Sequence, residues 1–185
     1  MIRRPPRSTL DRSSAASDVY KRQEVPYREI GEICVRSASV MVGYWRDPEN
    51  TAKAIRDGWL RTGDMAYMDE ERYIFIVGRK NDMIKRGGEK FYPQEIEEIL
   101  FDHPAVLEAA VCGVADPDWG ESPRAYVVIR PGYQISEKDV FAYCLDRLPK
   151  FKCPQGVVFL PELPKTSSGK ITRKGLQQLN VGSSN

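Results

Sequence analysis

The chain has 185 residues, of which 41% are hydrophobic and 29% are charged, a composition typical of a globular protein. Its formal net charge of +2 comes from residues 1–23, which hold six of the 28 basic residues and two of the 26 acidic ones, so the rest of the chain is slightly acidic. This balance excludes nucleic-acid binding by a basic surface, and no apolar run approaches the ~20 residues that a transmembrane helix needs.

Residues 1–23 match none of the usual targeting segments. They lack the apolar core and the small-residue cleavage site of a secretory signal, and Pro5, Pro6 and Asp11 argue against the amphipathic helix of a transit peptide. The segment resembles the translated adapter or vector sequence that contaminates some assembled reads. We therefore expect a non-native leader, and a native N-terminal part that is missing upstream of Glu24.

The first periodic segment, Gly31–Ser37, has the pattern of a half-buried strand. Ile33 and Val35 alternate with Glu32 and Cys34, and a strand directs successive side chains to opposite faces. The pattern predicts that Ile33 and Val35 face the core.

A short helix, a turn and a second strand are predicted in the rest of residues 24–78. Pro48 at a first helical position and Glu49 in the first turn indicate a helix start. The pair Asp57-Gly58 indicates a turn, and the nearly continuous apolar run Tyr73–Val77 indicates a strand. These elements have too little else to bury them, so we expect the end of a larger β-rich domain.

Residues 83–180 carry enough periodic segments for a small independent α+β domain. Gly87 and Gly88 predict a tight turn between two short strands, and Pro93 begins a helix. Ser136 and Asp139 have the spacing of a capping box before a second helix. The expected buried strands are Val106–Val114, Ala125–Ile129 and Val157–Leu160, and the expected inward-facing helix residues are Ile96, Ile99, Leu100, Val140, Phe141, Cys144, Leu145 and Leu148.

The cysteine and histidine pattern predicts no metal site. The four cysteines form no CxxC pair, and the single histidine, His103, precedes a proline at an expected helix end. Free thiols within apolar stretches suit a reducing cytoplasm.

Four motifs stand in a fixed order along the chain, and together they resemble the late core motifs of the adenylate-forming superfamily. They are Gly43–Thr51 (GYWRDPENT), Leu60–Asp64 (LRTGD), Gly78–Pro93 (GRKNDMIKRGGEKFYP) and Pro164–Arg173 (PKTSSGKITR). One such motif is weak evidence, but four in order are specific. The superfamily contains acyl-CoA synthetases, adenylation domains of peptide synthetases and luciferases.

The resemblance implies a division of the chain. Residues 24–78 would be the C-terminal end of the large AMP-binding domain, residues 79–82 a hinge, residues 83–180 the mobile C-terminal lid domain and residues 181–185 a tail. The expected fold class is therefore α+β, a small lid domain joined to the β-rich end of a larger domain.

The resemblance assigns Asp64 and Arg79 to the nucleotide. An ionised carboxylate accepts hydrogen bonds from both hydroxyls of a ribose, which suits Asp64, and Gly63 permits the tight backbone before it. Arg79 follows the predicted strand Tyr73–Val77, and its planar charged fork suits the ribose or phosphate region. The alternative interpretation is structural. In the absence of the other motifs, Asp64 would be expected only to shape a turn, and Arg79 would be expected only to lie on the surface at the end of a strand.

Lys170 is the residue expected to carry the chemistry of adenylation. A compact ammonium on a long stem can stabilise the negative charge that builds when a carboxylate attacks the α-phosphorus of ATP. A P-loop is excluded because Pro164 stands where its first glycine is needed and Ile171 where its Ser or Thr is needed. The sequence Ser167-Ser168-Gly169 predicts a mobile loop.

The resemblance places the hinge at Asn81, where the family usually has Asp or Lys. It also assigns Lys85, Gly87 and Gly88 to the second half-reaction, since glycines let backbone approach a pantetheine arm closely. A solvated surface lysine explains Lys85 equally well.

The leading functional hypothesis is a fragment of an ATP-dependent acyl-CoA ligase that uses ATP, Mg2+ and coenzyme A. Its expected partners are a carboxylic acid, coenzyme A and the missing N-terminal domain, its expected location is the cytoplasm, and its expected role lies in fatty acid metabolism. The fragment alone should be inactive, because the phosphate loop and acyl pocket lie upstream. The alternatives are an adenylation enzyme that loads a carrier protein and a non-catalytic truncated interaction module.

Overall fold

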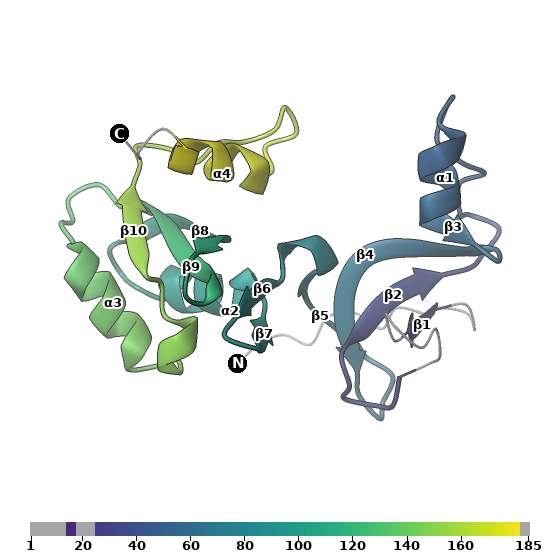
Figure 1. The fold of residues 1–185 in the computed structure, drawn as a ribbon, viewed down its shortest axis with the longest axis horizontal. Coiled ribbons are helices and arrows are strands. Elements are labelled where there is room, and N and C mark those ends of the chain that lie inside the picture. The colour runs from purple at the N-terminus through teal and green to yellow at the C-terminus, as the bar shows by residue number, and fades with distance from the viewer. Residues whose placement is uncertain (1–13, 18–24, 182–185) are drawn as a thin grey trace. The chain divides into compact units, whose positions relative to one another are not determined.

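The computed structural model describes residues 14–17 and 25–181, and it divides the chain into two compact units. Unit 1 is residues 1–81 and unit 2 is residues 82–185, and each has its own five-stranded sheet (Figure 1). The expected leader lies outside the described residues apart from Ser14–Ser17, which forms strand β1. Among the described residues, no helix has both the length and the apolar character to cross a membrane.

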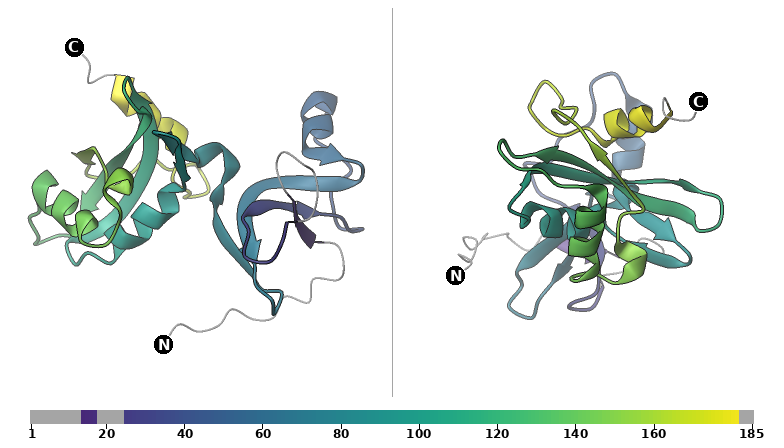
Figure 2. Two further views of the ribbon diagram at one scale, coloured as in Figure 1. Left: turned by 60° about the horizontal axis from the view of Figure 1, so that its bottom comes forward. Right: turned by 90° about the vertical axis from the view of Figure 1, so that its left-hand side faces the viewer.

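Unit 1 is an antiparallel sheet with the strand order β1-β2-β4-β3, in which β5 also pairs with β4. Its elements are β1 (Ser14–Ser17), β2 (Gly31–Val35), α1 (Pro48–Ala54), β3 (Ile55–Arg56), β4 (Trp59–Met68) and β5 (Ile74–Arg79). Strand β4 is long and strongly bent (Figure 1, Figure 2). Its register shifts against both β2 and β5, and such bulges bend a strand locally.

The predicted helix start and turn in unit 1 are confirmed. Pro48 is the first residue of α1, and the Asp47 side chain accepts a hydrogen bond from the Asn50 N–H at 3.0 Å as its N-cap. Asp57 and Gly58 have φ of 52° and 77° and join β3 to β4, because positive φ at both central residues matches the twist of a two-residue hairpin.

The predicted buried face of β2 is wrong. Glu32 and Cys34 are buried, with 3% and 8% of their surface exposed, whereas Ile33 and Val35 are only half-buried. Glu32 tolerates burial because Arg61 donates to its carboxylate from 29 positions away. Apolar alternation within one strand carries no information about such a distant partner.

Unit 2 contains a mixed sheet with the order β10-β9-β6-β7, in which β8 also pairs with β9. Strands β9 and β10 are parallel and the other pairs are antiparallel. The elements are β6 (Ile84–Arg86), β7 (Glu89–Phe91), α2 (Pro93–Phe101), β8 (Val106–Asp116), β9 (Gly120–Ile129), α3 (Glu137–Leu145), β10 (Gly156–Phe159) and α4 (Arg173–Val181), with the 3-10 turn η2 at Lys150–Lys152. A further 3-10 turn, η1 at Lys80–Asp82, contains the boundary between the units.

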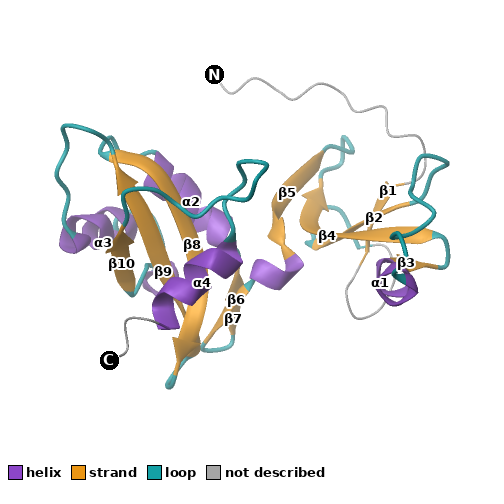
Figure 3. Cartoon of the chain, turned by 90° about the horizontal axis from the view of Figure 1, so that it is seen from above, coloured by secondary structure: helices purple, strands orange, loops and turns teal. Residues whose placement is uncertain are grey.

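Helices cover both faces of the unit 2 sheet (Figure 3). Alternate residues of β8 and β9 point to opposite faces, so Val111 and Val127 pack with α2 and α3, while Cys112 and Tyr126 pack with α4. Leu176 of α4 is fully buried against that second face. The mixed α+β fold class is confirmed.

Most predicted elements of unit 2 are present, with three differences. The capping box of Ser136 and Asp139 forms at the start of α3. Leu145, predicted to face inward, is 44% exposed because α3 ends at that residue. Strands β8 and β9 run beyond their predicted ends into one long hairpin, and helix α4 was not predicted at all.

Candidate functional site

Asp64 and Arg79 lie opposite each other on neighbouring strands. They are register partners in the β4–β5 pair, and Arg79 Nε donates to Asp64 Oδ1 at 2.9 Å. The Arg79 side chain is 66% exposed and the Asp64 side chain 30%, so this pair contributes little to stability but orients the carboxylate. The sequence predicted both residues for one ligand without predicting that they pair.

The backbone before Asp64 takes a conformation that favours glycine. Gly63 has φ +76°, where a side chain would be strained, although a Cβ there would meet no atom within 4 Å. The Asp64 N–H donates to Thr62 Oγ1 at 3.0 Å, and Thr62 Oγ1 donates to the Ile33 carbonyl at 3.0 Å. Strand β2 therefore helps to hold the TGD turn.

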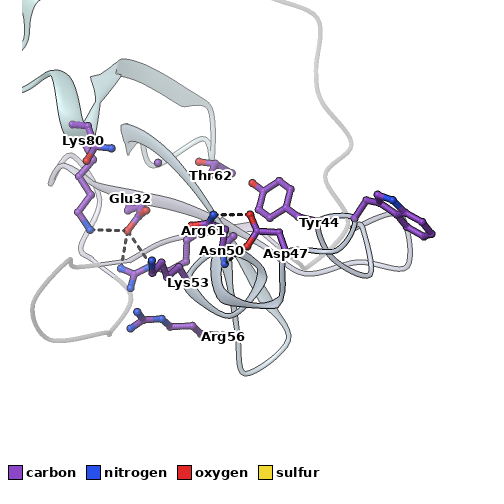
Figure 4. A pocket seen from close by; sticks show the side chains of 13 residues that line it. Glu32, Tyr44, Asp47, Asn50, Lys53, Arg56, Arg61, Thr62 and Lys80 are labelled. Carbon is purple, nitrogen blue, oxygen red and sulfur yellow. Dashed lines mark hydrogen bonds and ion pairs between the residues drawn. The ribbon is translucent and has the colours of Figure 1, made fainter. Parts of the chain in front are cut away.

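Unit 1 contains an open hollow of about 770 Å³ (Figure 4). Gly63, which precedes Asp64, and Asn81, the middle residue of η1, are part of its wall. The other lining residues are Glu32, Tyr44, Trp45, Asp47, Asn50, Lys53, Ala54, Arg56, Arg61, Thr62 and Lys80. The lining is rich in charged and polar side chains, so the hollow suits a polar, hydrated ligand.

A buried carboxylate organises the wall of this hollow. Glu32 Oε2 accepts hydrogen bonds from Arg61 Nη2 at 2.7 Å and from Lys80 Nζ at 3.3 Å (Figure 4). Lys80 directly precedes Asn81, so the ion pair ties the first residue of η1 to strand β2.

Lys170 is exposed at a compact turn in unit 2. The Thr166 N–H donates to the Lys170 carbonyl at 2.8 Å, and the Gly169 N–H donates to the Thr166 carbonyl at 2.9 Å. A bridge between Lys165 and Ile171 closes the base of the turn. Thr166 supplies both backbone and hydroxyl partners for the internal hydrogen bonds of this turn.

Lys85, Gly87 and Gly88 lie together on the β6–β7 hairpin. Lys85 is exposed, and both glycines have positive φ, of 56° and 89°. A Cβ at Gly87 would lie 2.7 Å from the ring of Trp119, so only glycine fits there without displacing that ring. Trp119 was not singled out in the sequence, although the Asp-Pro-Asp-Trp-Gly turn before β9 is a visible signal.

The candidate residues are divided between the units. Asp64, Arg79 and Asn81 belong to unit 1, whereas Lys170 and the β6–β7 hairpin belong to unit 2. Sequence reasoning also missed Arg173, whose half-buried guanidinium donates to two carboxylates at the start of α4.

Comparisons with known proteins agree with the motif pattern. Residues 95–170 match the family model described as AMP-binding enzyme C-terminal domain. The chain is 48% identical over 151 residues to the long-chain-fatty-acid–CoA ligase of Bacillus subtilis (strain 168), covering 82% of this chain and 27% of that ligase. It is 44% identical over 155 residues to the 2-succinylbenzoate–CoA ligase of Bacillus mycoides (strain KBAB4), covering 84% and 32%.

Solved structures show the same likeness in three dimensions. The crystal structure of ATP-bound MatB from Rhodopseudomonas palustris matches with a TM-score of 0.85 and 38% identity, over 90% of this chain and 33% of that one. The chain spans about a third of the length of the curated relatives it matches.

Proposed function

The chain belongs to the adenylate-forming superfamily of AMP-binding enzymes, and on that premise we propose that it is part of an ATP-dependent acyl-CoA ligase. The observation that carries the proposal is Lys170, exposed on a hydrogen-bonded turn of the C-terminal domain that matches the family. The enzyme would convert a carboxylic acid and ATP to an acyl-adenylate, and then transfer the acyl group to coenzyme A.

In the first half-reaction a carboxylate oxygen attacks the α-phosphorus of ATP. A new P–O bond forms, the bond to the β-phosphate oxygen breaks, and pyrophosphate leaves. Negative charge builds on the transferring group, and the Lys170 ammonium stabilises it. Asp64, oriented by Arg79, accepts hydrogen bonds from the ribose hydroxyls and so fixes the nucleotide.

In the second half-reaction the thiol sulfur of coenzyme A attacks the acyl carbon. The new C–S bond forms, the C–O bond to AMP breaks, and the thiol proton is lost to solvent or to a base outside the described residues. At Gly88, where a Cβ would meet no atom within 4 Å, the backbone leaves room for a pantetheine arm, whereas the Trp119 ring fills the space beside Gly87. Rotation at residues 79–82, centred on Asn81, would exchange Lys170 for this hairpin between the steps.

Coenzyme A is the acceptor that the relatives favour. The two ligases described above are both named CoA ligases, whereas loading of a carrier protein has no such support here. Their named acids, 2-succinylbenzoate and a long-chain fatty acid, differ, so the proposal specifies a carboxylic acid and no particular one.

Magnesium and cellular location complete the proposal. Among the described residues no three His, Cys, Asp or Glu side chains gather as metal ligands would. All four cysteines are free and buried, which is in keeping with work in a reducing cytoplasm.

A chimeric enzyme tests the proposal. Residues 25–181 would replace the matching segment of the Bacillus subtilis long-chain-fatty-acid–CoA ligase, and acyl-CoA formation would be measured. We expect an active chimera in which Lys170→Ala lowers ATP–pyrophosphate exchange about 100-fold or more. The same variant should still convert supplied acyl-adenylate to acyl-CoA, since Lys170 acts only in the first half-reaction.

Lys138→Ala is the matched control, because Lys138 is an exposed lysine on α3 of the same unit. It should leave both half-reactions unchanged. A folded chimera in which Lys170→Ala retains full exchange would reject the proposal. The isolated 185-residue chain should show no ATP–pyrophosphate exchange, because it matches only 32% and 27% of the length of these two ligases.

A further inference from the structure

Arg173, the first residue of α4, makes a partly buried cluster of contacts within unit 2. Its Nε donates to Asp82 Oδ2 at 2.8 Å, and its Nη1 and Nη2 donate to the two oxygens of Glu97 at 2.6 and 3.2 Å. Arg173 Nη1 also donates to the backbone carbonyl of Val111. The backbone N–H of the same residue, Val111, donates to Glu97 Oε1 at 2.7 Å. One guanidinium thus joins α4 to η1, α2 and β8.

The cluster is too well enclosed to be an incidental surface pair. The side chains of Arg173, Asp82 and Glu97 are 23%, 27% and 12% exposed. Burial disfavours the charge on Arg173, but the hydrogen bond and charge of Glu97, together with Asp82, outweigh it, so the pKa of Arg173 is raised. Charged groups in such surroundings need partners with good geometry, and a guanidinium fork supplies it.

The two segments that Arg173 joins are the ones the proposed mechanism moves. Asp82 is the last residue of η1 and directly follows Asn81. Arg173 directly follows the turn that carries Lys170, and the Thr172 N–H donates to the Pro164 carbonyl at 2.9 Å across the base of that turn. The contact therefore fixes the base of the lysine turn to the last residue of the hinge, Asp82.

The other side of the turn has its own anchor. Lys165 Nζ donates to Glu108 Oε1 on β8 at 2.6 Å, with both side chains more than 30% exposed. This pair holds the turn to the sheet but has no link to η1. The Arg173 cluster is what connects the turn to Asp82.

We propose that Arg173 is a positioning residue for Lys170, locking the lysine turn to Asp82 so that rotation at the hinge carries the ammonium to a fixed place. The inference rests on the proposed function. Lys170 acts on reacting atoms, and Arg173 acts through it. A lysine at position 173 could reach one carboxylate but could not fork between two and a carbonyl.

The test uses the chimera described above with two variants that perturb the link differently. Asp82→Asn keeps the Arg173–Glu97 pair and weakens only the connection to η1, whereas Arg173→Lys weakens the whole cluster. We expect Asp82→Asn to lower kcat for adenylation about 10- to 100-fold, as misplacement of a catalytic group does, while KM for ATP stays within about twofold. Thioester formation from supplied acyl-adenylate should also stay within about twofold.

A second readout needs no activity. In the 185-residue chain, Asp82→Asn should speed hydrogen exchange of the Gly169 amide, whose bond to Thr166 depends on a fixed turn. Arg28→Lys is the matched control, because Arg28 also forks onto one carboxylate, Glu70, at an exposed site in unit 1. It should change neither readout.

The outcomes separate this inference from the proposed function. Selective loss of adenylation supports positioning by Arg173. The inference would be overturned if Asp82→Asn lowered both half-reactions equally, which would show a structural role alone. It would also be overturned if Asp82→Asn lowered neither half-reaction and left the hydrogen exchange of the Gly169 amide unchanged. Full adenylation by Lys170→Ala in the same chimera would reject the proposed function, and this inference with it.

Discussion

At the residue scale, Glu32 of unit 1 combines a buried carboxylate with two cationic partners. It is 3% exposed, and its Oε2 accepts from both Arg61 and Lys80. Its partners are 18% and 35% exposed and can turn partly to water when the carboxylate is neutralised. Loss of the charge therefore costs less than it would for a fully buried pair.

We expect Glu32→Gln to lower the free energy of unfolding of unit 1 by about 2 kcal/mol, because the amide replaces three charge-assisted hydrogen bonds with weaker ones. Glu70→Gln is the control, since it removes the charge of the exposed partner of Arg28 and should lower the free energy of unfolding by less than Glu32→Gln does. Urea unfolding followed by Trp59 fluorescence measures both. Equal costs would contradict the role assigned to burial.

Cys144 gives a prediction for pH. Burial, followed by the neighbouring Cys153, raises the pKa of the Cys144 thiol from 9.0 to about 12. Above pH 9 the unfolded chain loses this proton while the folded chain keeps it, so unfolding releases a proton and stability falls as pH rises toward 12. The contribution of this thiol is at most about 1.4 kcal/mol per pH unit.

The measurement is the free energy of unfolding by urea between pH 8 and 10.5, in the native sequence and in Cys144→Ala. The variant should be less stable at pH 8, because it leaves a small cavity, but its stability should fall less steeply above pH 9. Parallel slopes in the two proteins would show that Cys144 ionises in the folded state as it does in the unfolded chain.

At the element scale, the two neighbouring glycines of the β6–β7 hairpin differ in the space that surrounds them. Gly87 and Gly88 both have positive φ, but a Cβ at Gly87 would lie 2.7 Å from the Trp119 ring, whereas one at Gly88 would meet nothing within 4 Å. Each alanine pays for the left-handed backbone, roughly 1–2 kcal/mol, and only Gly87→Ala must also displace the ring.

We therefore expect Gly87→Ala to destabilise unit 2 by about 1 kcal/mol or more beyond Gly88→Ala, and to shift the Trp119 fluorescence. Urea unfolding monitored in a Trp45→Phe, Trp59→Phe background isolates that signal. If the two alanine variants unfold at the same urea concentration, the ring does not constrain the turn.

Local patterns were sufficient for elements whose cause is local. The start of α1 at Pro48, the Gly87-Gly88 turn and the Ser136–Asp139 capping box depend on residues within four positions of each other, and all three are present. Elements with distant causes escaped prediction. The buried face of β2 depends on Arg61, which no pattern within the strand can reveal.

Helix α4 and its cluster escaped for the same reason. Its described sequence is polar apart from a few residues, and its position depends on Leu176 packing on the sheet and on Arg173 reaching Asp82 from 91 positions away. The pairing of Asp64 with Arg79 likewise required the β4–β5 register. The candidate residues could be named from motifs, but the contacts that position them could not.

At the scale of the whole molecule, the two units differ in how much core they bury. Unit 2 has two hydrophobic clusters, one on each face of its sheet. In the described part of unit 1 the buried hydrophobic residues are Cys34, Met65 and Ala66, while Val42 and Trp45 are 101% and 85% exposed. Because unit 1 buries less apolar surface, the hydrophobic effect contributes less to its free energy of unfolding than to that of unit 2.

We expect two unfolding transitions in urea, with unit 1 unfolding first. Trp59 reports unit 1 and Trp119 reports unit 2, so Trp119→Phe and the Trp45→Phe, Trp59→Phe pair separate their signals. Coincident transitions from both reporters would contradict independent units. Exposed apolar side chains in unit 1 also predict stronger binding of a hydrophobic dye before the first transition than after the second.

The long span between Asp82 and Arg173 has a consequence for the order of folding. The β8–β9 hairpin closes over a short turn and loses little chain entropy in doing so, whereas the Asp82–Arg173 contact must close a loop across 91 positions. The hairpin should therefore form early and the contact late. The segment proposed to carry the reactive ammonium is then among the last parts of unit 2 to acquire its native shape, so a chain stalled before that point would hold a nearly complete sheet and no chemistry.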